Sequence, residues 1–195
     1  MKRAVAVAAA LAVLGAVLLA WWNHRALAEL DRRFVADTLA AADRRAVAES
    51  RRLKAAYGPE VWPGFGRADL PQVLYNDRRE FLAGWPAPPP AGWRRTGGPP
   101  LLDVPVWSRS AEDPRPFAVQ IEGRWAGRYP VRRVLNRERV RRARDGMDPI
   151  SRALVPPRLS TAPVDLYVAQ LLHTAFHAYQ ARRSEERFYE AVELQ

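Results

Sequence analysis

The chain of 195 residues contains no cysteine. Disulfide frameworks, thiolate zinc sites, iron–sulfur clusters and cysteine nucleophiles are therefore excluded. Histidine occurs only three times, and all but Lys2 and Lys54 of the 31 basic residues are arginine. There is no glycine-rich phosphate loop, and neither Ser151 nor Ser160 has a recognisable histidine partner for nucleophilic catalysis. The length allows one domain of ordinary size with a short anchor or arm.

Acidic residues are in the minority, 21 against 31 basic ones, which gives a formal net charge of +10. A basic surface favours anionic partners such as phospholipid headgroups or nucleic acid, although net charge does not identify a reaction. Hydrophobic residues make up 48% and charged residues 27% of the chain, so it is predicted to fold despite its 17 prolines.

The amino terminus carries an apolar run from Ala4 to Trp22, without one polar side chain. In helical form this run matches the hydrocarbon thickness of a bilayer, and indole rings such as those of Trp21 and Trp22 prefer the headgroup level. We therefore predict an uncleaved signal-anchor over residues 1–25. It crosses the lipid bilayer through residues 4–22 and leaves the following domain on the exported side, periplasmic or extracellular. Cleavage after Ala28 is the alternative.

The next segment, residues 26–58, lacks glycine and proline up to Gly58 and is rich in alanine and arginine. It is predicted to be a helix that ends at Gly58-Pro59 and either acts as a stalk or folds back on the domain.

Residues 59–195 are predicted to form an α+β domain. Short apolar runs between prolines and glycines predict strands in a small antiparallel sheet, at residues 72–75, 80–83, 104–107, 117–121 and 125–129. Helices are expected to follow and to pack on this sheet. The tryptophans at positions 62, 85, 93, 107 and 125 are interpreted as core volume rather than as a carbohydrate or peptide platform.

An arginine-dense stretch follows from Val131 to Arg144, and its apolar spacing predicts a helix with a narrow buried face. Non-specific contact with anionic surfaces is expected from Arg132, Arg133, Arg137, Arg141 and Arg142. The stretch lacks interleaved aromatic residues for base stacking, and the chain carries a membrane segment, so no specific nucleic-acid partner is predicted. The expected partners are anionic lipid or an envelope protein.

The last helix is expected to begin near Ser160 and to bury a stripe made of Val164, Val168, Leu171, Leu172, Phe176 and Tyr179. The neighbouring stripe carries His173 and His177, one turn apart. Histidines at positions i and i+4 of a helix can direct two nitrogens to one ion, which is why helical metal sites use that spacing.

The segment Leu171–Gln180, LLHTAFHAYQ, resembles the active-site helix of the HExxH zinc metallopeptidases, the zincins. The resemblance implies that His173 and His177 are zinc ligands. It also implies a third ligand from a following helix, for which Glu190 and Glu193 are the candidates. The match fails at the general base, because the position of the family's catalytic glutamate is occupied by Thr174.

A threonine hydroxyl has no accessible basic form near neutral pH, so it cannot take the proton from metal-bound water. No catalytic residue is therefore assigned. The helical pattern continues to Gln195 without a cap, and we expect the domain to be truncated there.

These observations predict a membrane-anchored, exported protein related to the HExxH metallopeptidases that has lost, or never completed, its catalytic apparatus, with zinc as its cofactor. The alternative is a non-enzymatic envelope protein that binds a protein partner or anionic lipid. In that case the two histidines are ordinary residues on a packed helix.

Overall fold

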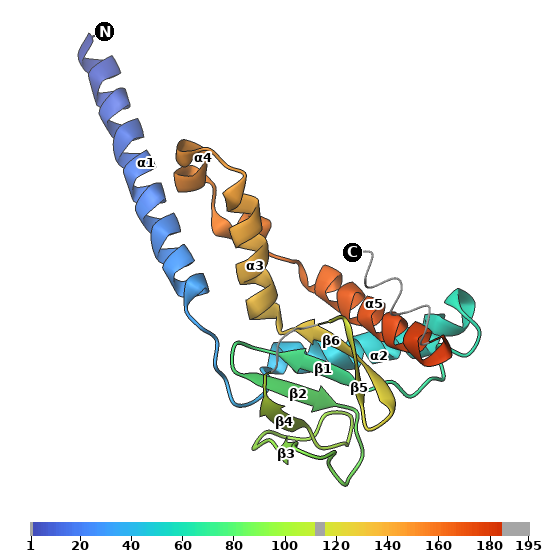
Figure 1. Ribbon diagram of the computed structural model, residues 1–195. Coiled ribbons are helices and arrows are strands. Elements are labelled where there is room, and N and C mark those ends of the chain that lie inside the picture. Colours follow the sequence, from blue (N-terminus) through green and yellow to red (C-terminus); the bar gives the residue numbers. More distant parts are fainter. Residues whose placement is uncertain (1, 112–115, 185–195) are drawn as a thin grey trace. The chain divides into compact units, whose positions relative to one another are not determined.

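The computed structural model describes residues 2–111 and 116–184 (Figure 1). The chain divides into two units. The first combines Met1–Arg33 with Arg133–Ala162, and the second combines Phe34–Arg132 with Pro163–Gln195. The segment Arg133–Ala162 is therefore an insertion, because the chain leaves the second unit after Arg132 and returns to it at Pro163.

The first unit is helical. It contains α1 (Lys2–Asp31), α3 (Arg132–Asp145, apart from its first residue), α4 (Pro149–Leu154) and the short 3-10 helix η1 (Pro157–Ser160). Within this unit α1 contacts both α4 and η1. The start of α4 is fixed by Asp148, whose carboxylate accepts hydrogen bonds from the backbone N–H groups of Ile150 and Ser151. Helix α4 was not predicted from the sequence.

Helix α1 has 30 residues and is long and apolar enough to cross a membrane. At 1.5 Å per residue it measures about 45 Å, which exceeds the hydrocarbon thickness of about 30 Å. The apolar part from Ala4 to Leu19 is exposed throughout. The predicted amino-terminal apolar helix is thus present, and it continues beyond the predicted boundary at residue 25 to Asp31.

The second unit contains a sheet of six strands in the order β3-β4-β2-β1-β6-β5. The strands are β1 (Gln72–Tyr75), β2 (Arg79–Ala83), β3 (Arg94–Arg95), β4 (Trp107–Ser110), β5 (Ala118–Ile121) and β6 (Arg124–Pro130). All pairings are antiparallel except that of β1 with β6, which is parallel. The α+β class is confirmed, and the predicted antiparallel sheet is corrected to a mixed one. Strands β1 and β6 can run parallel because a long connection, rather than a hairpin, joins them.

Two further helices, α2 (Ala41–Val61) and α5 (Val164–Arg183), complete this unit. Helix α5 packs on β5 and β6, and α2 packs against α5. One core cluster joins α5 to its face of the sheet through residues such as Trp125, Ala175 and Ala178. A second cluster contains Val73, Leu82 and three tryptophans. The alternation along β1 separates the two clusters, since Gln72 bonds to α5 while Val73 lies in the second cluster.

The continuous helix predicted over residues 26–58 is corrected to two helices, because residues 32–40 are not helical. Two polar residues of the second unit bind this linker. The backbone N–H of Phe34 donates to Asp77 Oδ2 at 2.7 Å, and Asn76 Nδ2 donates to the carbonyl of Ala36 at 2.7 Å. Beyond the linker α2 buries Val47 and belongs to the α+β unit. Helix propensity alone could not show these tertiary contacts.

The prediction that the tryptophans supply core volume is confirmed at positions 85, 93, 107 and 125, which are all buried. It is wrong for Trp62, whose side chain is 51% exposed and meets Phe176 edge-on with ring centroids 6.0 Å apart. The fourth strand begins at Trp107 rather than at residue 104. The preceding residues form a tight turn closed by pairing between Leu101 and Val104.

Helix α5 approaches β6 most closely at Gly127. A Cβ atom at Gly127 would lie 2.8 Å from the carbonyl carbon and oxygen of Thr174, so this approach requires glycine. The residues of α5 buried beside it are small, namely Ala175 and Ala178. The predicted stripe of large apolar residues is confirmed at Val168, Leu171 and Tyr179, which are buried. It is corrected at the other three positions, since Val164 is exposed and Leu172 and Phe176 are half-buried.

Candidate functional site

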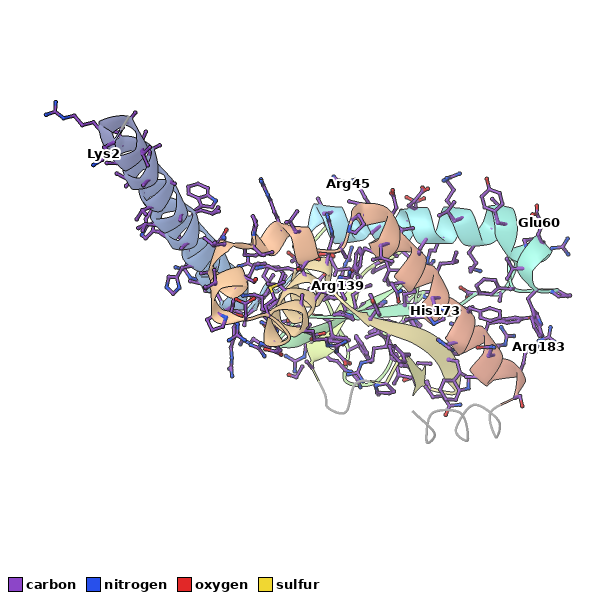
Figure 2. The ribbon with its side chains drawn as sticks, turned by 90° about the horizontal axis from the view of Figure 1, so that it is seen from above. Lys2, Arg45, Glu60, Arg139, His173 and Arg183 are labelled. Atoms are coloured by element: carbon purple, nitrogen blue, oxygen red, sulfur yellow. The ribbon has the colours of Figure 1, made fainter. Side chains whose placement is uncertain are left out.

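The histidine pair occupies an accessible face of α5, on which Figure 2 labels His173. The Nε2 atoms of His173 and His177 lie 2.9 Å apart, and the two rings are nearly perpendicular, with centroids 4.4 Å apart. One turn of helix produces this convergence, because side chains at i and i+4 project from the same face. The prediction that both imidazoles share one face of this helix is confirmed.

His177 is the more enclosed member of the pair. The ring of Phe117, which precedes β5, stacks on it with a centroid distance of 6.1 Å and an interplanar angle of 24°. Burial lowers the pKa of His177, repulsion from His173 lowers it further, and a hydrogen bond with Gln180 acts in the opposite direction. The imidazole of His177 is therefore favoured in its neutral form, which is the form that binds a metal ion.

Thr174, which occupies the position of the missing general base, is buried between α5 and the sheet. Thr174 is only 1% exposed, and its hydroxyl donates a hydrogen bond to the carbonyl of Leu171 at 3.0 Å. Its backbone forms the contact with Gly127. The threonine hydroxyl is thus bonded within its own helix and does not reach a place where it would activate a water molecule.

A third metal ligand is not found among the described residues. No group of three or more histidine, cysteine, aspartate or glutamate side chains within residues 2–111 and 116–184 is placed to hold a metal ion. The candidates Glu190 and Glu193 lie outside the described residues. Two imidazole nitrogens alone make a weaker zinc site than the usual three or four ligands.

The arginines of α3 do not form one surface. Arg133 donates to the backbone carbonyl of Glu29 at 3.1 Å, and Arg141 lies 3.9 Å from the Asp31 carboxylate, so both face α1. Arg137 lines a small cavity against α1, and Arg142 is exposed. Arg132 belongs to the second unit instead. Contact of these arginines with an anionic surface stays a prediction.

One buried charge cluster was missed by the sequence analysis. Glu80 is fully buried and forms ion pairs with Arg128 and with Arg109, whose Nε lies 2.8 Å from Glu80 Oε2. The guanidinium of Arg109 also lies 4.7 Å from the centre of the Trp93 ring. The cross-strand register brings these groups together, since Glu80 pairs with Arg109. One carboxylate is held by two guanidinium groups, which leaves the cluster with a net positive charge and fixes Glu80 between neighbouring strands.

A second buried polar group links the two chain segments that flank the insertion. Asp43 of α2 accepts hydrogen bonds from the backbone N–H of Arg132 at 2.9 Å and from the Tyr167 hydroxyl at 3.1 Å. Burial raises the pKa of Asp43, whereas these two hydrogen bonds lower it. Burial and the adjacent carboxyl raise the pKa of Tyr167 well above its usual value. No sequence motif marks this pair, because its members are 124 residues apart.

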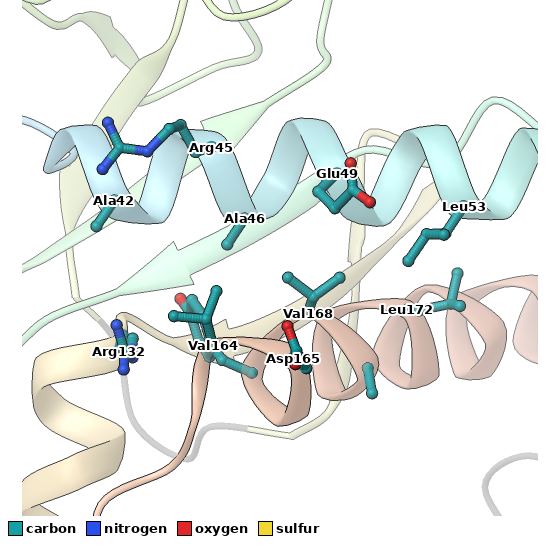
Figure 3. A pocket seen from close by; sticks show the side chains of 12 residues that line it. Ala42, Arg45, Ala46, Glu49, Leu53, Arg132, Val164, Asp165, Val168 and Leu172 are labelled. Atoms are coloured by element: carbon teal, nitrogen blue, oxygen red, sulfur yellow. The ribbon is translucent and has the colours of Figure 1, made fainter.

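A cavity of about 570 Å³ opens between α2 and α5 (Figure 3). Its apolar walls are formed by Ala46 and Leu53 of α2, which face Val168 and Leu172 of α5. The charged residues Arg45 and Glu49 also come from α2. The two histidines do not line it. The lining also includes four charged residues, Arg45, Glu49, Arg132 and Asp165, while the apolar walls suit an apolar ligand or side chain.

The structure therefore offers two separate candidate sites in the second unit. The histidine pair supplies converging nitrogen atoms without a general base, and the cavity supplies apolar surface without a catalytic set. Comparisons of this chain with protein families, with curated proteins and with solved structures find no match.

Proposed function

We propose that the chain is a membrane-anchored protein whose helix α5 carries a zinc-binding histidine pair, related to the HExxH metallopeptidases but without peptidase activity. The observation that supports the proposal is the 2.9 Å separation of the Nε2 atoms of His173 and His177. Two nitrogens bound tetrahedrally to zinc at 2.0–2.1 Å are about 3.3 Å apart. A small rotation of either ring, moving its nitrogen by about 0.4 Å, gives that separation.

The proposed protein is inactive as a peptidase because its general base is absent. Zinc bound to a peptidase helix supplies a polarised water molecule, which a nearby carboxylate must deprotonate. Thr174 occupies the position of that carboxylate, and its hydroxyl is bonded to Leu171. The proposed role of the zinc ion is therefore structural or regulatory. Glu190 and Glu193 are the proposed sources of a third ligand.

The proposed anchor is α1, with the rest of the chain on the exported side of the membrane. Support comes from the exposed apolar surface of Ala4–Leu19 and from the exposed indole rings of Trp21 and Trp22. An apolar helix that is uncovered by protein requires a bilayer or a binding partner. The short tail before the span is expected to stay in the cytoplasm, since long following domains are usually exported.

Zinc titration of the full chain in detergent micelles tests the proposed metal site. We expect zinc to raise the melting temperature of the parent protein, because an ion that binds only the folded state stabilises it. At a zinc concentration of 100 times Kd the gain is about 2.7 kcal/mol. Affinity should fall as the pH is lowered, because protons compete with zinc for the imidazole nitrogens.

Three alanine variants make this test specific. His173→Ala and His177→Ala should each abolish most of the zinc-dependent shift. His24→Ala removes the third histidine of the chain, which lies in α1, and should leave the shift unchanged. A parent protein without any zinc-dependent change, or an equal loss in the His24→Ala variant, would contradict the proposal.

Protease protection tests the proposed topology. The full chain should remain in the membrane fraction with its amino-terminal segment intact, and protease added to intact spheroplasts should digest the carboxy-terminal unit. A soluble product beginning near Glu29 would refute the uncleaved anchor. Protection of the carboxy-terminal unit would refute the exported orientation.

A second candidate function is favoured by the cavity between α2 and α5. An apolar cavity of about 570 Å³ beside charged residues fits a non-enzymatic envelope protein that binds an apolar side chain of a partner. Leu53→Glu, which places a carboxylate in this cavity, should abolish binding to such a partner without affecting zinc binding. If zinc does not change the melting temperature of the parent protein, binding of a partner in this cavity becomes the preferred function.

A further inference from the structure

Within the first unit, α1 is covered by protein from a defined point. Its residues up to Leu19 are exposed, whereas Ala20, Asn23, Leu27 and Leu30 are buried or half-buried. These four residues recur every three or four positions and therefore lie on one face of α1. Protein contact thus begins within the last turn of the apolar run that ends at Trp22. The covering elements include α4 and η1.

A buried hydrogen bond fixes the position of α4 along α1. Asn23 Nδ2 donates to the backbone carbonyl of Ala153 at 2.9 Å, and the Asn23 side chain is buried. A buried amide held by a carbonyl is costly to displace. Asn23 directly follows Trp22, whose indole marks the headgroup level if α1 spans a bilayer. Helix α4 is therefore held at the level where α1 leaves the membrane.

The outer side of α4 and η1 combines apolar and basic residues. Ile150 is 71% exposed and Leu159 is 72% exposed, which is high for large aliphatic side chains. Arg152 and Arg158 are exposed on the same two elements. We call these four residues the α4–η1 surface. Apolar side chains flanked by arginines are typical of elements that lie in the interfacial layer of an anionic bilayer.

The acidic residues nearby do not cancel this basic character. Asp148 uses its carboxylate to cap α4 through two backbone hydrogen bonds. Asp145 is exposed at the end of α3. The small cavity that Asp31 and Asp145 border is also lined by Arg137, Arg141, Arg144 and Arg152, so four arginines outnumber two carboxylates there.

We propose that the α4–η1 surface docks on the bilayer that α1 crosses, inserting Ile150 and Leu159 among the lipid headgroups while Arg152 and Arg158 contact anionic lipid phosphates. This inference rests on the membrane crossing by α1 proposed above. It goes beyond a single-helix anchor, because it makes the first unit a membrane-bound body with a second point of contact. That contact restrains how α1 rotates about its own axis.

Depth measurements on the full chain test this inference, and the absence of native cysteine makes them direct. Ile150→Cys and Leu159→Cys variants are labelled with a polarity-sensitive fluorophore and placed in nanodiscs of phosphatidylcholine with phosphatidylglycerol. Lipids carrying nitroxides at known depths quench the label. Exposed positions on α1 provide the scale, through Leu14→Cys in the apolar run, Trp22→Cys at its end and Ala28→Cys beyond it.

The labels at positions 150 and 159 should be quenched by headgroup-level nitroxides about as strongly as the label at position 22. Quenching like that at position 28 would overturn the inference while leaving the anchor intact, provided that the label at position 14 is deeply quenched. Loss of quenching at position 14 would overturn both proposals. Replacing phosphatidylglycerol by phosphatidylcholine should weaken quenching at positions 150 and 159. In a variant that also carries Arg152→Gln and Arg158→Gln, the same change of lipid should have no effect on this quenching. Equal quenching in both lipid mixtures would overturn the arginine contacts.

Discussion

Replacing Gly127 with alanine tests whether the contact between β6 and α5 holds the histidine helix in place. The added Cβ atom would lie 2.8 Å from the carbonyl carbon and oxygen of Thr174 and 3.0 Å from the backbone nitrogen of Ala175. Nonbonded carbon atoms prefer about 3.5–4.0 Å, so β6 and α5 must separate by about 0.7 Å or more. Both obstacles are backbone atoms, which no rotamer change removes. Forcing extra volume into such a contact costs about 1–3 kcal/mol.

Urea denaturation followed by tryptophan fluorescence measures this loss, since Trp125 lies in the same core cluster as Ala175. Gly127→Ala should lower the denaturation midpoint without changing the m-value. Gly97→Ala is the matched control, because a Cβ atom at Gly97 would meet no atom within 4 Å. That control should shift stability by no more than about 0.5 kcal/mol. Equal midpoints for the two variants would refute the assigned role of Gly127.

Four further variants test the buried polar groups and the histidine helix. Glu80→Gln should reduce the free energy of unfolding by about 3–5 kcal/mol in the same urea titration, because it leaves Arg128 and Arg109 without their buried carboxylate. The control Glu49→Gln breaks a surface pair with Arg52 and should cause no measurable change. Asp43→Asn should stabilise the protein at neutral pH, with the gain vanishing near pH 3.8. The raised pKa means that the folded Asp43 carboxyl favours its protonated form, so its contribution to stability is lost as the pH rises. His177→Gln should make stability less sensitive to acid below pH 6.5, because the lowered pKa of His177 favours the neutral ring in the folded state and protonation favours unfolding. Thr174→Val should cost about 1 kcal/mol through the lost hydrogen bond. Thr174→Glu should destabilise the protein far more, because it places a carboxylate at a buried position. A Thr174→Glu variant as stable as the parent would show that the helix has room for a carboxylate.

The features that the sequence predicts correctly depend on short-range spacing. The convergence of His173 and His177 follows from their separation by four residues in a helix, whatever the helix packs against. The long apolar helix at the amino terminus follows in the same way from the run between Ala4 and Trp22. Helix ends also depend on local signals, such as the Asp148 side chain that caps α4.

The features that the sequence does not predict depend on contacts between distant residues. Nothing near Asn76 or Asp77 shows that they bind the linker after α1, and this contact turns the predicted stalk into two helices of different units. The predicted stripe of α5 omits Ala175 and Ala178, which are buried where the helix approaches Gly127. The partners of Glu80 likewise depend on strand register, which short segments do not specify.

The hydrogen bond between Asn23 and Ala153 has a consequence for biosynthesis. The two residues are 130 positions apart, so Asn23 leaves the ribosome long before its acceptor exists. At about 5–20 residues per second, the delay is roughly 7 to 26 seconds. During that interval the face of α1 formed by Ala20, Asn23 and Leu27 has none of the partners supplied by α4. Helix α1 is therefore synthesised well before the unit to which it belongs is complete, and that unit closes only when the insertion following β6 has been synthesised.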